Sequence, residues 1–94
     1  MIENLISQRH LRIYGDVHAV GFRFEAKRLA DRLGINGWIR NNPNGTVEVE
    51  FVGKKNQLKA FENWCQKGPR FARVDRIEEL PINTEAHFDD FVIL

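Results

Sequence analysis

The stretch Gly15–Arg23 constrains the fold of this chain most strongly; it reads Gly-Asp-Val-His-Ala-Val-Gly-Phe-Arg. It follows the alternating run His10–Tyr14, which predicts a strand, and it leads into Phe22–Leu33, where apolar residues recur at helical spacing. A loop with glycine at each end, set between a strand and a helix start, can turn several backbone N–H groups toward one point. The stretch therefore predicts an anion site.

Arg23 supports this interpretation because a cation in the first turn of a helix gains nothing from the helix dipole. A bound phosphate or carboxylate would explain a guanidinium there. The alternative is that the glycines serve turn geometry alone and that Arg23 is a solvated surface residue. The loop lacks both the Gly-Lys-Ser/Thr of a Walker loop and the spacing of a dinucleotide fingerprint, so neither kind of nucleotide site is expected.

The rest of the chain divides into short elements. The first strand is expected from about Arg9 to Tyr14, and Gly34 is placed to cap the first helix. Later expectations are a strand Gly37–Asn41, a turn Asn42–Gly45, a half-exposed strand Thr46–Phe51, a helix Lys55–Lys67, a strand Phe71–Glu79 with a bulge or a bend between Val74 and Ile77, and a last strand Phe88–Leu94.

This order predicts an α+β, ferredoxin-like βαββαβ fold, with a mostly antiparallel sheet, two helices on one face and a short C-terminal strand. The hairpin would place Asn41 at the loop-facing end of its strand. Trp38 and Trp64 are expected in the core. We expect one domain over residues 1–94, with Met1–Ser7 loosely attached.

Composition excludes several classes of function. Lys and Arg outnumber Asp and Glu by only 14 to 13, so charge does not indicate nucleic acid or an anionic membrane as a partner. Cys65 is the one cysteine, so no internal disulfide can form, which indicates a reducing compartment. It lies on an apolar helical stripe, which indicates a buried, unreactive thiol. The three histidines are far apart in the sequence, which disfavours a metal site. No apolar run approaches the ~18 residues that a membrane-spanning helix needs. We expect a cytoplasmic protein without a metal site.

Three separated segments resemble the acylphosphatase family, and together they span nearly the whole chain. The family pattern Gly-x-Val-Gln-Gly-Val-x-Phe-Arg aligns with Gly15–Arg23, and Gly-Trp-Val-x-Asn followed by Asp/Asn-Gly-x-Val-Glu aligns with Gly37–Asn41 and Asn44–Glu48. The third segment, a Trp and then Gly-Pro-x-x-Ala-x-Val, appears as Trp64 and Gly68–Val74.

The resemblance implies hydrolysis of the carboxyl–phosphate bond of acyl phosphates by a monomer without a cofactor or metal. Arg23 would hold the phosphate and Asn41 would orient the attacking water. Phosphoryl transfer needs positioning and charge stabilisation more than covalent help, which agrees with these roles. The loop would bind substrate through Gly15, Asp16, Val17, His18, Ala19, Val20, Gly21 and Phe22.

The chain departs from the family pattern at two positions, where His18 replaces Gln and Ala19 replaces the inner Gly. A Cβ at position 19 would cost on the order of 1 kcal/mol if that residue needs a positive φ. We interpret His18 as a support of the loop. Reduced activity is therefore expected.

Two other functions stay open at this point. One is a non-catalytic or weakly active phosphate-binding domain on the same fold. The other is an RNA-binding module, since RNA-recognition domains share this order of strands and helices. Glu48 and Glu50 on the expected open face of the sheet disfavour RNA.

Overall fold

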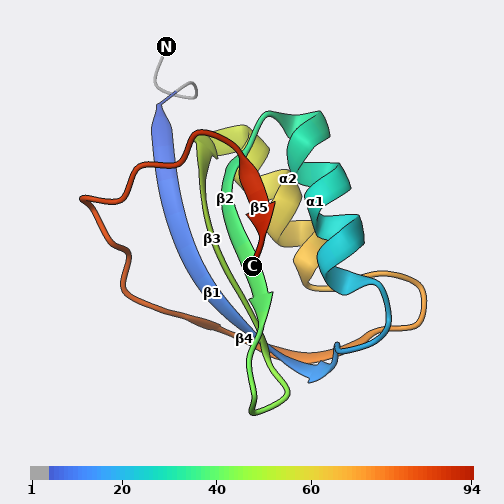
Figure 1. The fold of residues 1–94 in the computed structure, drawn as a ribbon. Helices are drawn as coiled ribbons and strands as arrows, with labels where there is room; N and C mark the ends of the chain where they lie inside the picture. The colour runs from blue at the N-terminus through green and yellow to red at the C-terminus, as the bar shows by residue number, and fades with distance from the viewer. Residues whose placement is uncertain (1–4) are drawn as a thin grey trace.

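The computed structural model describes residues 5–94 and contains five strands and two helices (Figure 1). The elements are β1 (Ile6–Asp16), α1 (Phe22–Leu33), β2 (Asn36–Asn41), β3 (Val47–Lys54), α2 (Lys55–Cys65), β4 (Arg73–Glu79) and β5 (Phe91–Ile93). The strands form one sheet in the order β4-β1-β3-β2-β5. All neighbours are antiparallel except β2 and β5. The predicted ferredoxin-like arrangement is confirmed.

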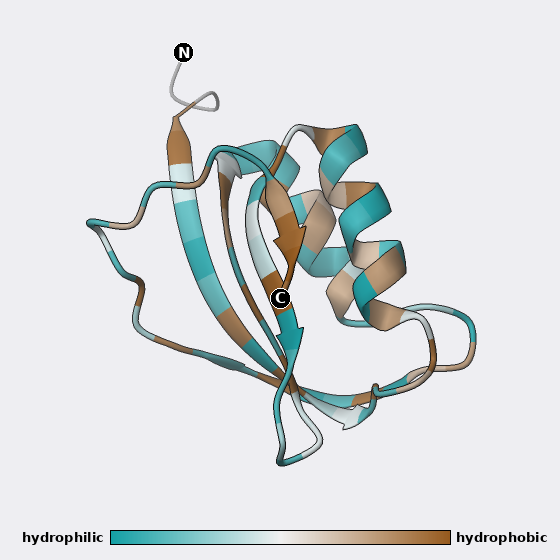
Figure 2. Cartoon of the chain, viewed as in Figure 1, coloured by the Kyte–Doolittle hydropathy of each residue, from teal (hydrophilic) through white to brown (hydrophobic). Residues whose placement is uncertain are grey.

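Both helices pack on one face of the sheet and the hydrophobic core lies between the two layers (Figures 1 and 2). The predicted apolar stripe of α1 is confirmed, because Phe22, Ala26 and Ala30 are buried. Gly34 takes a left-handed φ of 77° at the end of this helix, as its capping position requires. The expected thiol burial is also confirmed: Cys65 is fully buried, and burial raises the pKa of its thiol.

Several element boundaries differ from the predictions. Ile6 and Ser7 already pair with Lys54 and Gly53, so β1 and β3 are both longer than expected, and the predicted loose segment lies in part within the sheet. Residues 1–4 of that segment lie outside the described residues. The second helix stops at Cys65. The Lys67 N–H then donates to the Trp64 carbonyl, three residues back, at 3.0 Å, and Gly68 follows with a left-handed φ of 70°.

The two late strands are shorter than predicted. β4 begins at Arg73, where its pairing with Asp16 starts. β5 begins at Phe91 because only Phe91–Ile93 pairs with β2. The predicted bulge is confirmed, since Tyr14 pairs with Arg76 and Gly15 pairs with Val74, which leaves one residue of β4 unpaired between them.

The face of the sheet away from the helices is more covered than predicted. Glu48 and Glu50 of β3 are buried rather than exposed, with 6% and 4% of their surface accessible. The segment after β4 explains this: the Asn83 N–H donates to Glu50 at 3.0 Å. Figure 1 shows this segment passing outside β1 before the chain returns as β5.

The two tryptophans have different environments. Trp64 packs against the core beside Phe22, with 5.1 Å between ring centroids, as expected. Trp38 was expected in the core, but it lies on the opposite face, where Arg40 stacks on it at 5.0 Å and His10 meets its edge. The reason is strand alternation, since the neighbouring Ile39 takes the core position.

Candidate active site

A small hollow of about 180 Å³ lies where the loop after β1, the start of α1, the end of β2 and β5 meet. These elements converge because β1, β2 and β5 run in the same direction, so their C-terminal ends lie at the same end of the sheet. The residues lining the hollow are Val17, Ala19, Gly21, Phe22, Arg23, Phe24, Asn41 and Ile93. Arg23 and Asn41, distant in sequence, therefore face the same hollow.

The loop reaches the helix through two residues with left-handed backbone. Ala19 has φ 59°, and Gly21 has φ 82° and is the N-cap of α1. Within residues 5–94, none of the backbone amides from His18 to Phe24 donates a hydrogen bond to a backbone or side-chain acceptor. Unpaired amides at a helix start are donors that an anion satisfies well.

Arg23 is half-buried in the first turn of α1. In the described part of the chain it forms no ion pair or hydrogen bond, whereas Lys27 and Arg28 on the same helix pair with Asp31 and Glu25. A guanidinium without an acidic partner keeps its charge available for a bound oxyanion.

Asn41 ends β2, paired with Val47 across the hairpin, as the sequence predicts. Its Oδ1 atom is buried and has no hydrogen-bond partner among residues 5–94. A buried acceptor without a donor is costly unless a ligand or water supplies one. Asn41 therefore lines the hollow and has an acceptor atom that no described residue satisfies.

His18 supports the loop rather than lining the hollow. Its Nε2–H donates to the carbonyl of Thr46 at 2.9 Å, and a carbonyl can only accept, so Nε2 carries a hydrogen. Thr46 directly precedes β3, in the hairpin that carries Asn41. The hydrogen bond thus ties the loop to the strand that ends in Asn41.

The predicted loop residues divide into two groups. Val17, Ala19, Gly21 and Phe22 line the hollow together with Arg23 and Asn41, whereas Gly15, Asp16, His18 and Val20 do not. Gly15 has a structural role: its φ is 141°, and a Cβ there would collide with the Arg73 carbonyl of β4. Asp16 is exposed beside Arg73.

Sequence reasoning missed Phe24 and Ile93 as lining residues. A signal for Phe24 was present, because this aromatic residue follows Arg23 and falls outside the apolar stripe of its helix. Ile93 carried no such signal, since its position depends on the parallel pairing of β5 with β2.

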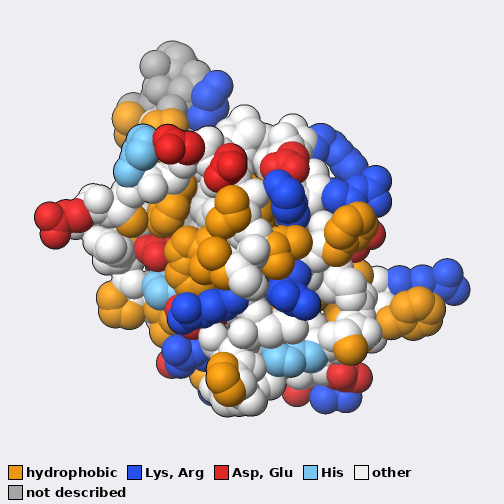
Figure 3. Space-filling model, in the orientation of Figure 1, with side chains coloured by type: hydrophobic (Ala, Val, Ile, Leu, Met, Phe, Trp, Pro, Cys, Tyr) orange, Lys and Arg blue, Asp and Glu red, His pale blue; other side chains and the backbone are white. Residues whose placement is uncertain are grey.

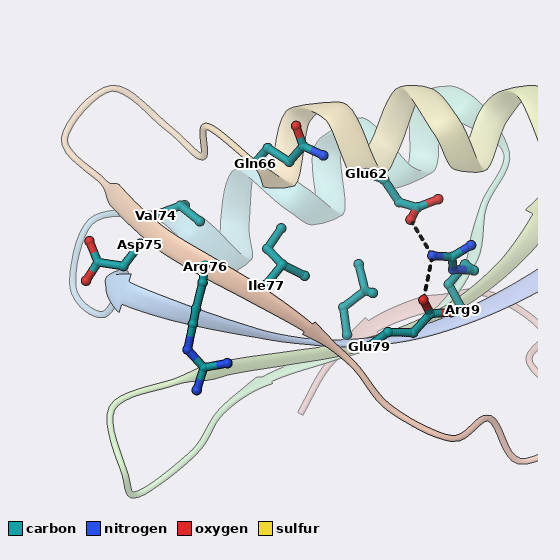
Figure 4. A pocket seen from close by; sticks show the side chains of 9 residues that line it. Arg9, Glu62, Gln66, Val74, Asp75, Arg76, Ile77 and Glu79 are labelled. Atoms are coloured by element: carbon teal, nitrogen blue, oxygen red, sulfur yellow. Dashed lines mark ion pairs between the residues drawn. The ribbon is translucent and has the colours of Figure 1, made fainter.

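A larger hollow of about 450 Å³ lies between α2 and β4 (Figure 4). Arg9 spans it, with ion pairs of 3.2 Å to Glu62 and to Glu79. Burial raises the pKa of Glu62 despite Arg9, and Glu79 raises it further. None of the residues that the sequence singles out for chemistry lines this hollow, and the Arg9 guanidinium is already paired.

Among residues 5–94, no three His, Cys, Asp or Glu side chains gather in a way that could hold a metal ion. Over the same range, neither helix is long and apolar enough to cross a membrane.

Comparison with known proteins identifies the family of the chain. The acylphosphatase family model matches residues 9–93. The acylphosphatase of Syntrophus aciditrophicus is 37% identical over 90 residues, covering 96% of this chain and 94% of that protein. That of Thermococcus kodakarensis is 49% identical over 69 residues, covering 73% and 76%. The crystal structure of acylphosphatase from Bacillus subtilis superposes with a TM-score of 0.87 at 28% identity, over 96% of this chain and 99% of that one. This chain therefore belongs to the acylphosphatase family of enzymes.

Proposed function

We propose that Arg23 and Asn41 carry the acyl phosphate hydrolysis that membership of this family entails. The observation that supports the proposal most directly is the shared hollow. It is lined by Arg23, which has no ion pair among the described residues, and by Asn41, whose buried amide oxygen has no hydrogen-bond partner there. The phosphate would lie against Arg23 and the free amides of the loop. Together they offset the charge of the phosphoryl oxygens without a metal.

In this proposal, Asn41 accepts a hydrogen bond from water through Oδ1 and holds the water against the phosphorus. The water oxygen forms the new P–O bond while the bond to the acyl oxygen breaks, and the carboxylate leaves with the electron pair. Because Asn41 is neutral and no base is needed for so good a leaving group, the water proton passes to a phosphoryl oxygen. The products are a carboxylate and inorganic phosphate.

The test is hydrolysis of benzoyl phosphate with EDTA present. Arg23→Ala should lower kcat/KM by about 10²–10³-fold, the range for removal of a transition-state donor. Asn41→Ala should lower kcat by a similar factor while inorganic phosphate still inhibits, because phosphate binding depends on Arg23 and the loop. Arg32→Ala, which removes an exposed cation from the last turn of the same helix, is the control and should leave the rate unchanged.

The outcomes separate an acylphosphatase from a domain that only binds phosphate. Turnover that survives Arg23→Ala would contradict the assigned roles. If the wild type binds inorganic phosphate but does not hydrolyse benzoyl phosphate, the chain is instead a non-catalytic phosphate-binding domain.

We also propose that the chain acts as a single domain over residues 1–94, as a monomer in the cytoplasm, without a metal or cofactor. Its partners would be a small acyl phosphate and inorganic phosphate, rather than nucleic acid or a membrane. The near-zero net charge disfavours nucleic acid or an anionic membrane as a partner, and the single, buried cysteine supports a reducing compartment. Activity that persists in EDTA and a monomer mass by light scattering would agree with it.

A further inference from the structure

Two large apolar side chains lie at the rim of the catalytic hollow with much of their surface open to solvent. Phe24 is 60% exposed and Ile93 is 39% exposed, and both line the same hollow as Arg23 and Asn41. Figure 3 shows hydrophobic side chains gathered over the C-terminal strand on this face, with Lys and Arg beside them. Exposed apolar area is expected on any surface, but here it adjoins the reacting groups.

The positions of these two residues follow from the fold. Phe24 comes directly after Arg23 in the first turn of α1, on the side of the helix away from its buried stripe. Ile93 pairs with Ile39, two residues before Asn41 on β2. The rim is therefore fixed to the same two elements that carry Arg23 and Asn41.

The two cations that follow Phe24 on α1 are already paired. Lys27 donates to the Phe91 carbonyl at 2.7 Å and pairs with Asp31 at 3.1 Å. Arg28 lies 3.7 Å from Glu25 and over the Phe24 ring. Arg23 would bind the phosphate, so its charge is not available to the acyl group. The rim therefore offers the acyl group apolar contact rather than an unpaired positive charge.

We propose that Phe24 and Ile93 form the acyl subsite, and that the preferred substrates are acyl phosphates whose acyl group is apolar rather than one that carries a second carboxylate. This inference rests on the proposed function, because it is Arg23 and Asn41 that orient the phosphate end. The acyl group then leaves the hollow across the rim and removes apolar surface of Phe24 and Ile93 from water.

A neighbouring hollow offers a competing position for the acyl group. It has a volume of about 380 Å³ and is lined in part by Val20, Trp64 and Phe71, and Phe71 is 74% exposed. Neither Arg23 nor Asn41 lines it. Phe71 is therefore a matched control: an exposed aromatic residue near the loop but outside the catalytic hollow.

The experiment compares kcat/KM for benzoyl, acetyl and succinyl phosphate in the wild type, Phe24→Ala, Phe24→Leu and Phe71→Ala. Phe24→Ala should lower the value for benzoyl phosphate by about tenfold, as is usual for lost apolar contact in a substrate pocket. The loss should be much smaller for acetyl phosphate, whose methyl group reaches less of the rim. Phe24→Leu should recover most of the loss, and Phe71→Ala should match the wild type.

Three results would overturn the inference. They are equal losses for benzoyl and acetyl phosphate in Phe24→Ala, a wild type that prefers succinyl phosphate, or a benzoyl-specific loss in Phe71→Ala. In each of these cases the wild type still hydrolyses acyl phosphates through Arg23, so the proposed function stands. Absence of turnover with all three substrates would instead refute the proposed function, and the acyl subsite with it.

Discussion

At the scale of single residues, the backbone at position 19 limits the phosphate loop. Ala19 is the only non-glycine residue of positive φ in residues 5–94, at 59°. Left-handed backbone costs a residue with a Cβ roughly 1–2 kcal/mol. Ala19 also lines the catalytic hollow, so its strained backbone belongs to the cradle itself. The sequence predicts this cost only if position 19 has a positive φ, and Ala19 does have one.

Ala19→Gly should therefore stabilise the protein and open the cradle. Relief of about 1–2 kcal/mol of backbone strain outweighs the extra unfolded-state entropy of glycine, about 0.4–1 kcal/mol. We expect a net gain of about 0.5–1 kcal/mol in urea unfolding, together with a lower inhibition constant for inorganic phosphate.

The control is Ala60→Gly, at an exposed position within α2. The same substitution in a right-handed helix should cost about 1 kcal/mol. Destabilisation by both variants would show that the backbone of Ala19 is not strained.

At the scale of elements, one hydrogen bond joins the two parts of the site. His18 in the loop donates to Thr46, the residue before β3. Asn41 pairs with Val47 in the same hairpin. The loop and the strand end that carries Asn41 are therefore held together by a side chain that itself lies outside the hollow. His18 is a positioning residue in this arrangement.

His18→Ala should lower kcat/KM by about fivefold, because a net hydrogen bond of about 1 kcal/mol is lost between loop and hairpin. His18→Gln should stay close to the wild type, since the amide nitrogen of Gln can donate to the same carbonyl. The measurement is the pH profile of kcat/KM for all three proteins.

A supporting role predicts the same profile shape for His18→Gln and the wild type. If the profile lost an ionisation in His18→Gln, His18 would take part in proton transfer, and the positioning role would be wrong.

At the scale of the whole molecule, a buried carboxylate organises the open face of the sheet. Burial by itself raises the pKa of Glu48, but hydrogen bonds from His10, Asn42 and Arg40 outweigh it, so the pKa lies below its ordinary value of 4.5. The Nδ1–H of His10 also donates to the Pro81 carbonyl at 2.8 Å. The network thus links β1, β2 and β3 to the segment that follows β4.

A carboxylate whose pKa is lowered by folding contributes stability above its unfolded pKa and loses it as the pH falls through its folded pKa. Glu48→Gln should therefore cost about 1–3 kcal/mol at pH 7, because charge-assisted hydrogen bonds are lost. The difference in the free energy of unfolding between Glu48→Gln and the wild type should shrink as the pH falls below 4.5. Urea unfolding at pH 7 and at a pH below 4.5 measures it.

Glu85→Gln is the matched control, since Glu85 is exposed in the segment between β4 and β5. It should leave stability unchanged at both pH values. An undiminished cost of Glu48→Gln at the lower pH would mean that the loss comes from packing rather than from charge.

The sequence by itself determined the order of the elements, the full extent of α1, the bulge in β4 and the hairpin that ends β2 at Asn41. These depend on local rules, namely side-chain periodicity and the backbone preferences of Gly, Pro and Asn, so the sequence alone is enough to read them. The loop motif likewise pointed to Arg23 because a first-turn arginine has no local reason to be there.

Only the tertiary structure decided which residues surround the site and what covers the sheet. Period-two alternation says that Trp38 and Ile39 face opposite ways, but not that Ile39 takes the core side. The burial of Glu48 and Glu50 and the placement of Ile93 depend on the segment Leu80–Asp90 and on β5, which meet the sheet only through long-range pairing. Local pattern cannot encode such contacts, because they form between residues far apart in the chain.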